Sequence, residues 1–498
     1  MPFPILSAIV FAPIVAGLLI LLFPAERKGE IRAAALAAAT FALLLSIWVY
    51  FAYNTQIGGY QFIEKYAWLP FLGISYYVGV DGMSAPLVLL TGVVMFTGVL
   101  ISWGIEDRPR EFFAFLFILA SGVFGVFVSL DLFMLFFFYE IAVFPMYLLI
   151  AIWGWVKTRE YAAMKLTLYL FVGSVIALVG ALVMYFESGL NTFDMLALER
   201  AGFSTQFQQV WFLPVFLGFA ILGGIFPFHN WSPDGHVAAP TAVSMFHAGV
   251  LMKLGAFAAL RVGIMLLPEG AVFWKWLILG LATVNVVYGA FIAMVQKDFK
   301  YVIGFSSVSH MGLVMLGFAT LTKEGLVGAG LQMFSHGVMT ALFFAVVGMI
   351  YDRTHTRQIP ELGGISKKMP LVTVAFILGG LVSMGMPGLS GFVAEFPIFM
   401  GVWRVQPWVA ILAAISIVIT ASYIIRIIGK VFFGALPPAF EYGDEAAGTH
   451  AIGDVTVLDK VALVLICVIM VAIGVYPSVM APLIESGVEN ILRLVGGV

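Results

Sequence analysis

Three ionisable side chains lie inside long apolar stretches of this sequence, where a lipid bilayer would tend to expel them. Lys253 is the only lysine or arginine well inside such a stretch, and two carboxylates, Glu140 and Glu395, have similar surroundings. A charge at the centre of a membrane span costs about 2.5–3.5 kcal/mol on insertion scales, so such groups usually have a function. The three residues are therefore candidates for proton exchange. Structural alternatives remain for each: an interfacial helix end for Glu140, a snorkelling lysine for Lys253 and a backbone-bound carboxylate for Glu395.

Two histidines in similar surroundings could pass protons between these groups. His310 and His336 both lie in apolar stretches and both have serine neighbours. An imidazole titrates near neutral pH, and it can donate a hydrogen bond with one nitrogen while the other accepts. Either histidine alone could equally be a packing residue, so the hypothesis depends on the set that they form with Lys253 and Glu395. Three further histidines have spacings that match no compact zinc motif: His229, His236 and His247.

The composition places these residues in a membrane protein. Of the 498 residues, 62% are hydrophobic and 10% are charged, against roughly 25% charged residues in soluble domains. The net charge of −2 offers no basic face for nucleic acid, and the single Cys467 excludes disulfides, cysteine-ligated zinc and iron–sulfur clusters. No glycine-rich phosphate loop follows a strand pattern. The chain is therefore expected to hold no redox centre of its own.

Apolar stretches of about 20 residues, long enough to cross a bilayer, recur along the whole chain. They predict an all-α polytopic protein with about fourteen transmembrane helices, which begin near residues 5, 31, 83, 112, 132, 164, 210, 239, 274, 302, 328, 369, 408 and 457. The first stretch lacks a basic leading region and a small-residue cleavage site, so we expect a retained helix.

Basic residues are unequally divided between the two sides of such a bundle. One side has seventeen of them: Arg27, Lys28, Arg32, Arg108, Arg110, Lys157, Arg159, Lys165, Lys297, Lys300, Arg353, Arg357, Lys367, Lys368, Arg426, Lys430 and Lys460. The other has seven: Lys65, Arg200, Arg261, Lys275, Lys323, Arg404 and Arg493. Because positive charge collects on the cytoplasmic side, we expect a multi-pass protein of the cell inner (cytoplasmic) membrane with both termini outside the cytoplasm.

Two stretches rich in glycine and proline, residues 223–233 and 385–391, interrupt apolar segments. Paired interruptions of this kind are typical of inverted-repeat transporters, in which the ion path lies near the breaks. Tight loops are the alternative. We therefore expect one membrane domain made of N-terminal helices (residues 1–110), a first repeat (111–265), a second repeat (274–433) and a C-terminal helix (457–498).

Several motifs resemble those of one protein family. They lie at residues 138–147, 227–236, 239–241, 307–312 and 385–388. In content and order they resemble the antiporter-like membrane subunits of the proton-translocating NADH:quinone oxidoreductase, respiratory complex I, and most closely its subunit M (subunit 4 type). The resemblance extends from about residue 80 to residue 435.

The resemblance implies a proton-carrying role for six residues: Glu140 as the fifth-helix glutamate, Lys165 as a sixth-helix lysine, Lys253 as the central lysine, His310 and His336 as members of a hydrophilic axis, and Glu395 as the terminal exchange group. One position departs from the family pattern. Seven residues before His229 the family has a lysine paired with the fifth-helix glutamate, and this chain has Leu222. Either Lys165 replaces that lysine beside Glu140, or pumping in this chain differs.

The family implies proton translocation in a complex I-like enzyme. The expected partners are other membrane-arm subunits, lipids and protons; flavin, iron–sulfur clusters and quinone would belong to partner subunits. Two alternatives remain open. One is a subunit of a multisubunit cation/proton antiporter or of a membrane-bound hydrogenase, and the other is a scaffold subunit that has lost transport.

Overall fold

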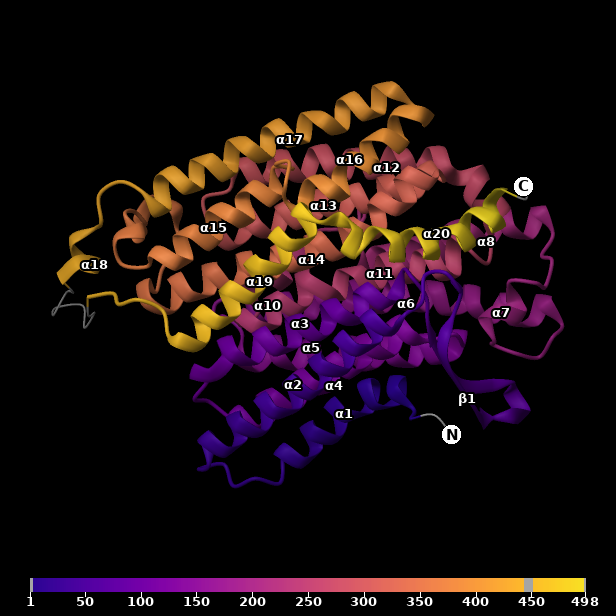
Figure 1. Ribbon diagram of the computed structural model, residues 1–498, viewed down its shortest axis with the longest axis horizontal. Helices are drawn as coiled ribbons and strands as arrows, with labels where there is room; N and C mark the ends of the chain where they lie inside the picture. The colour runs from indigo at the N-terminus through magenta and orange to yellow at the C-terminus, as the bar shows by residue number, and fades with distance from the viewer. Residues whose placement is uncertain (1–2, 443–450, 497–498) are drawn as a thin grey trace.

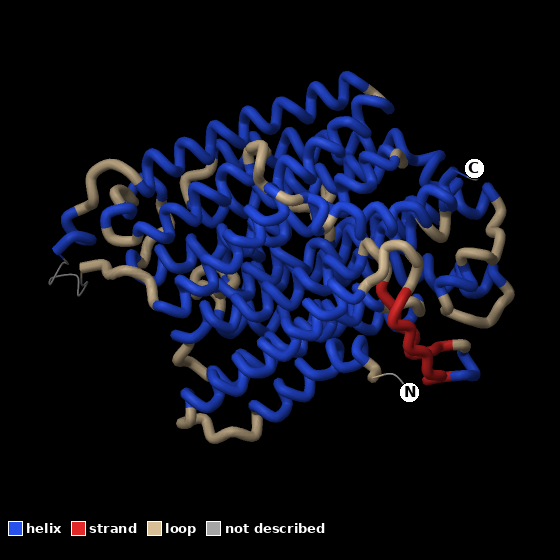
Figure 2. Tube along the Cα trace, in the orientation of Figure 1, coloured by secondary structure: helices blue, strands red, loops and turns tan. Residues whose placement is uncertain are grey.

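The computed structural model describes residues 3–442 and 451–496, and most of them are helical (Figure 1 and Figure 2). Twelve helical segments in this part of the chain are long and apolar enough to cross a membrane. The protein is therefore an all-α polytopic membrane protein, as its composition predicts.

The elements of the first half of the chain are α1 (Ile5–Ile20), α2 (Lys28–Ala52), β1 (Gln61–Leu69), β2 (Ile74–Val80), α3 (Ser84–Ile101), α4 (Pro109–Val128), α5 (Leu132–Trp153), α6 (Arg159–Ser188), α7 (Met195–Leu198), α8 (Thr205–Leu222) and α9 (Trp231–Ala238). Next comes one continuous helix made of α10 (Thr241–Phe246), η3 (His247–Leu251), α11 (Met252–Ala258) and η4 (Ala259–Ile264). The elements after it are α12 (Pro268–Val295), α13 (Phe299–Thr320), α14 (Lys323–Thr354), α15 (Pro370–Ser383), α16 (Ser390–Val405), α17 (Pro407–Ile427), α18 (Pro438–Tyr442), α19 (Val457–Val475) and α20 (Ala481–Gly496).

Two of the fourteen expected spans are shorter than the rest. Helix α1 has 16 residues and α15 has 14. At 1.5 Å per residue these helices are roughly 24 and 21 Å long, less than the ~30 Å of hydrocarbon that a straight span must cross. The count of fourteen therefore stays a prediction, and so does the division into repeats, whose ranges include residues 1–2 and 497–498 outside the described part.

Both expected helix interruptions are present. The first lies between the end of α8 at Leu222 and the start of α9 at Trp231, and the second lies between α15 and α16. Gly224 and Gly385 have positive φ angles of 76° and 66°, a backbone conformation that glycine adopts without steric cost. The glycines therefore allow the chain to turn inside the apolar region at both points.

The centre of the bundle is made of α13, α14 and the continuous helix α10–η4. Nearly all of their residues are buried, and their sequences are apolar on every side, as expected for helices that other helices surround. The segments η3 and η4 are π-helical. Such wider turns often mark functional positions in helices, and Lys253 lies between these two.

Two features differ from the sequence prediction. Residues 61–80, for which no secondary structure was predicted from the sequence, form an antiparallel hairpin of β1 and β2, whose turn contains Gly73 at a φ of 68°. The aromatic and β-branched residues of these strands are the sequence signal for it. The described part of 457–498 holds two helices, because the chain breaks at Pro477 between α19 and α20.

The start of α1 and the end of α20 lie at the same end of the bundle as the hairpin (Figure 1). We call this the hairpin end. The opposite end is the basic end, because its loops contain most of the basic residues, among them Arg27, Lys157 and Lys297.

Candidate functional site

Lys253 is the central residue of the candidate site. Its side chain is completely buried, and its Nζ donates a hydrogen bond to the carbonyl oxygen of Ala248 in the π-helical segment η3. Among residues 3–442 and 451–496 it has no carboxylate partner within 4 Å. A backbone carbonyl attracts the ammonium group without adding a negative charge. Lys253 can therefore lose its proton without leaving a buried carboxylate unpaired.

Two histidines lie beside this lysine. His236 comes from α9, the segment after the first break, and its ring centroid is 4.0 Å from that of His247 in η3. The hydroxyl of Ser232 lies 3.0 Å from His236 Nε2. His247 directly precedes Ala248, whose carbonyl oxygen accepts the hydrogen bond from Lys253 Nζ. The segment after the first break therefore places a histidine against the helix that contains Lys253.

A second cluster surrounds Glu395, whose side chain is also buried. His310 Nε2 lies 3.6 Å from Glu395 Oε1, and Gln332 Nε2 donates a hydrogen bond of 3.3 Å to the same oxygen. The His310 ring stacks on that of His336 at a centroid distance of 5.3 Å. Since Glu395 lies in α16, the second break brings a carboxylate to the histidines of α13 and α14.

The two clusters lie on helices that pack against each other, and together they form one buried row of titratable groups. Gly249, one residue after Ala248 in η3, and Gly337, one residue after His336 in α14, face each other at close range. Several buried polar atoms have no protein hydrogen-bond partner in the described part of the chain. In the row they are both ring nitrogens of His247 and of His336 and the side-chain oxygen of Gln332; elsewhere they include both ring nitrogens of His229, the hydroxyls of Tyr139 and Ser307, and the side-chain oxygen of Asn285. Buried polar groups need partners, and internal water is the common one where protein provides none.

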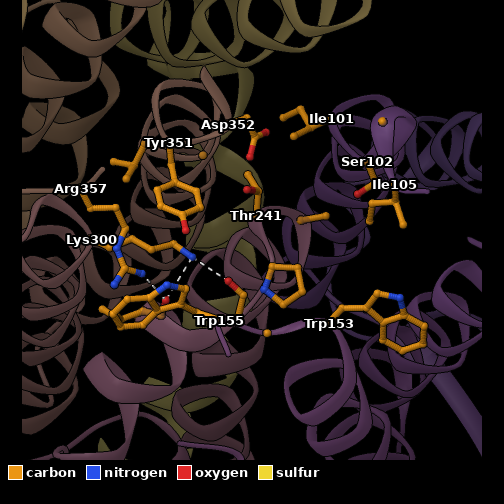
Figure 3. A pocket seen from close by; sticks show the side chains of 18 of the residues that line it. Ile101, Ser102, Ile105, Trp153, Trp155, Thr241, Lys300, Tyr351, Asp352 and Arg357 are labelled. Atoms are coloured by element: carbon orange, nitrogen blue, oxygen red, sulfur yellow. Dashed lines mark hydrogen bonds between the residues drawn. The ribbon is translucent and has the colours of Figure 1, made fainter. Parts of the chain in front are cut away.

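A cavity of about 570 Å³ lies near the basic end, and Lys300, Asp352 and Arg357 are among the residues of its wall (Figure 3). The Lys300 Nζ donates hydrogen bonds to the carbonyl oxygens of Ala239, at 2.6 Å, and Val237, at 3.4 Å. Val237 directly follows His236 in α9. The cavity wall therefore includes the residue that follows His236.

Ionised groups surround Lys300 in this cavity. Arg357 lies 4.1 Å from the ring of Trp155 and makes a 3.2 Å ion pair with Asp298. Burial raises the pKa of the Asp298 carboxyl, and the neighbouring Arg357 acts in the opposite direction. Asp352 lines the cavity together with Lys300 and Arg357, so its wall contains one carboxylate and two cationic residues, the kind of groups that mark ion and proton paths in membrane proteins.

Lys253, His310, His336 and Glu395, four of the six predicted site residues, thus lie in one row. His236 and His247 were not predicted from the sequence as members of the row, nor was Lys300 in the cavity next to it. Lys300 lies close to the end of an apolar stretch, where it resembles a loop charge. The spacings of His236 and His247 were tested only against zinc motifs. The sequence feature that could have identified them is the motif at residues 227–236, which contains His236 and lies just before the helix that contains His247.

Glu140 lies outside the row. Its side chain is exposed on the surface of α5, and its polar neighbour is Ser174 of α6. Lys165 does not pair with Glu140, because its Nζ makes a 2.7 Å ion pair with Asp234 of α9. The hypothesis that Lys165 replaces the family lysine beside Glu140 is wrong for this structure.

The positions of these residues along the axes of α5 and α6 explain why Lys165 does not reach Glu140. The two helices are consecutive and packed together, and Glu140 lies 13 residues before the end of α5. Lys165 lies 6 residues after the start of α6, and Ser174 lies 15. At 1.5 Å per residue, Lys165 is therefore about 10 Å from the level of Glu140, whereas Ser174 is near that level.

The Lys165–Asp234 ion pair holds the broken segment α9 against α6, and Tyr301 donates a 2.8 Å hydrogen bond to the same carboxylate. We expect Lys165→Met and Asp234→Asn each to lower the thermal stability of the assembled complex. The double variant should lose less stability than the two single variants lose together, and the difference, the coupling energy, should be roughly 0.5–3 kcal/mol. Additive losses in a thermal unfolding series would contradict a direct pair.

Comparison with known proteins gives a consistent family assignment. The family described as "NADH:quinone oxidoreductase/Mrp antiporter, TM" matches residues 129–420. "NAD(P)H-quinone oxidoreductase chain 4" of Gloeobacter violaceus is 35% identical over 99% of this chain and 93% of its own length. "NAD(P)H-quinone oxidoreductase chain 4-2" of Synechocystis sp. is 37% identical over 88% of this chain and 80% of its own.

Solved structures have the same fold. A chain of the structure titled "Respiratory complex I from Thermus thermophilus with bound NADH" superposes with a TM-score of 0.89 at 29% identity, covering 99% of this chain and 100% of that one. A chain of the Mrp complex from Dietzia sp. gives a TM-score of 0.86 at 20% identity, with the same coverages. The second similarity shows the fold alone.

Proposed function

Because the chain belongs to the NADH:quinone oxidoreductase/Mrp antiporter membrane family, we propose that it translocates protons as a membrane subunit of a complex I-like quinone oxidoreductase. The resemblance to subunit M agrees with relatives that are named chain 4 over nearly the full length. The flavin, iron–sulfur clusters and quinone belong to partner subunits in this proposal.

The observation that carries the proposal is the buried row that ends at Glu395. It contains groups that can both bind and release protons. Within it the His236 ring lies against His247, the His310 ring stacks on His336, and His310 lies beside Glu395. A charge that moves by one step changes the electrostatic energy of the next group strongly in a low-dielectric interior. A change at one end of the row can therefore propagate as a sequence of protonation changes.

The cavity at Lys300 supplies the row with protons from the basic end. We assign this end to the cytoplasm of the cell inner membrane, because seventeen basic residues lie on that side and seven on the other. In this orientation both chain termini lie outside the cytoplasm. Glu395, at the far end of the row, is then the exchange group for release or for transfer to a neighbouring subunit.

The exposed position of Glu140 indicates that a partner subunit packs against α5. An exposed carboxylate halfway along α5, between the exposed rings of Phe137 and Phe144, would face hydrocarbon in an isolated chain. That arrangement is costly. We propose that this face of α5 packs against another membrane-arm subunit, which provides a polar or basic partner for Glu140.

Isolation of the native complex tests the proposal. Purified in mild detergent and analysed by mass spectrometry, the complex should contain NADH- or quinone-reactive subunits and should couple electron transfer to proton uptake in liposomes. A hydrogenase module, or only other antiporter-like subunits, would contradict the assignment to a quinone oxidoreductase.

Lys300 offers a test of the uptake path. Lys300→Gln keeps much of the side-chain length but removes the titrating amine, so we expect donor-driven proton pumping to fall roughly tenfold, equivalent to about 1.4 kcal/mol in the barrier. Lys297→Gln is the matched control, because Lys297 is an exposed lysine three residues earlier. Pumping that is equal in the two variants would remove Lys300 from the path.

A further inference from the structure

We propose that the ion pair between Arg261 and Asp81 is a seal that separates Lys253 from a cavity at the hairpin end. Its consequence for pumping rests on the proposed function, but the seal itself is a property of the structure. Arg261 is in η4, on the same continuous helix as Lys253, and Asp81 is in the loop between β2 and α3.

The Arg261 guanidinium is enclosed on all the sides that the structure describes. Its side chain is 4% exposed and contacts the carboxylate of Asp81, whose side chain is 5% exposed. Arg261 Nη1 donates a 3.0 Å hydrogen bond to the Tyr60 hydroxyl, and the guanidinium lies 4.9 Å from the centre of the Phe257 ring. Three segments that are distant in sequence therefore meet at this one cation.

Asp81 is held in place independently of Arg261. Its Oδ1 accepts hydrogen bonds from the backbone N–H groups of Met83, at 3.1 Å, and Ser84, at 2.9 Å. These bonds close the start of α3 and fix the carboxylate. A carboxylate fixed by backbone donors gives the arginine a defined position, so the pair is a rigid contact.

A cavity of about 380 Å³ at the hairpin end reaches this contact. Residues 57–60, 196–200 and 486–493 contribute to its wall, and so does Asp81. Lys253, Phe257 and Arg261 do not line it. The cavity therefore stops at the ion pair.

The path from this cavity to Lys253 would run along one helix face. Lys253, Phe257 and Arg261 are spaced four residues apart, which places them on the same face of their helix. Eight residues at 1.5 Å put Arg261 about 12 Å from Lys253 along the axis. A proton that moved between Lys253 and the hairpin end on this face would have to pass a phenyl ring and then a guanidinium.

A permanent cation is well suited to block that path. Guanidinium stays protonated in proteins, so it cannot pass a proton on as lysine or histidine can. A fixed positive charge in a narrow passage also repels hydronium, as in channels that exclude protons. With the pair intact, Lys253 would exchange protons only through the row and the cavity at Lys300.

Thiol reactivity at position 253 tests the seal without any need for pumping. In the assembled complex, with Cys467 replaced by alanine, Lys253→Cys places a single thiol of this chain behind the seal. Silver ion, a small thiol-reactive cation, is added to the hairpin side of sealed proteoliposomes, and the remaining thiol is then counted with a fluorescent maleimide after denaturation. Ser486→Cys, in the cavity wall, reports that the reagent reaches the cavity.

With the pair intact, the thiol at 253 should react at least roughly tenfold more slowly than the thiol at 486. In the neutral double variant Asp81→Asn/Arg261→Gln the difference should largely disappear. Tyr60→Phe removes one hydrogen bond from the guanidinium and creates no unpaired charge, so it should give an intermediate rate and serves if the double variant fails to assemble. Arg404→Gln, which breaks the exposed pair with Glu324 at the same end, should change nothing.

Fast reaction at 253 with the pair intact would overturn the seal, and so would protection that persists in both Asp81→Asn/Arg261→Gln and Tyr60→Phe. Neither outcome depends on pumping, so a failure of the seal is distinguishable from a failure of the proposed function. If the proposal holds, proteoliposomes with the double variant and a native Lys253 should also show a faster passive decay of an imposed proton gradient.

Discussion

Replacing Lys253 with alanine should abolish most donor-driven proton pumping while the complex still assembles. Acid–base groups that carry a proton through a reaction typically contribute a factor of 10²–10⁴, so we expect at least a tenfold loss. The substitution leaves the Ala248 carbonyl without its donor, at a cost of roughly 1–3 kcal/mol, and it leaves a cavity where the buried methylenes were, so the amount of assembled complex must be measured alongside pumping.

A second variant at the same position separates charge from proton exchange. Lys253→Arg keeps a buried cation but does not release its proton, so it should assemble and still fail to restore pumping. The measurement is proton uptake by proteoliposomes, normalised to electron transfer and to the amount of assembled complex. Lys157→Ala, at an exposed position, is the control, and normal pumping by an assembled Lys253→Ala complex would rule out the central role.

The charged residues within apolar stretches could be predicted, because the cost of placing a charge in a bilayer can be judged from the neighbouring sequence alone. Lys253 and Glu395 are costly in a bilayer whatever surrounds them, so the sequence alone marks them. The histidines needed a second observation, and the family resemblance supplied it for His310 and His336. The helix breaks could also be predicted, because glycine and proline determine the backbone locally.

Partnerships between distant residues could not be predicted. Asp81 and Arg261 are 180 positions apart, and both lie near the ends of apolar stretches, where a charge looks like an ordinary loop residue. Lys165 pairs with Asp234 and not with Glu140 because of how α5, α6 and α9 are positioned along one another. The hairpin was missed because a search for spans of about 20 apolar residues does not detect strands of 7 and 9 residues.

The row also explains why two broken helices belong to one mechanism. His236 in α9 and Glu395 in α16 both follow a break, and each contacts a histidine on an unbroken central helix. A shift of either short segment would change one contact of the row and leave the central helices in place. A proton-transfer path can thus be opened or closed by local movement, consistent with the role of discontinuous helices in transporters.

Replacing Glu395 with glutamine should impair pumping nearly as strongly as the loss of Lys253. Glutamine keeps the size of the side chain, and its oxygen can still accept the hydrogen bond from Gln332. It cannot bind and release a proton, so the far end of the row would lack its exchange group. The fold should be unaffected, which makes assembly a suitable internal check.

Titrating substitutions at this position should retain part of the activity. Glu395→Asp and Glu395→Lys can each exchange a proton next to His310, although aspartate is one methylene shorter and lysine reverses the charge. The measurement is again proton uptake per electron transferred, with Glu485→Gln, at a surface pair with Lys323, as the matched carboxamide control. If Glu395→Gln pumps as well as Glu485→Gln, the His310–Glu395 contact is structural and the row must release its protons elsewhere.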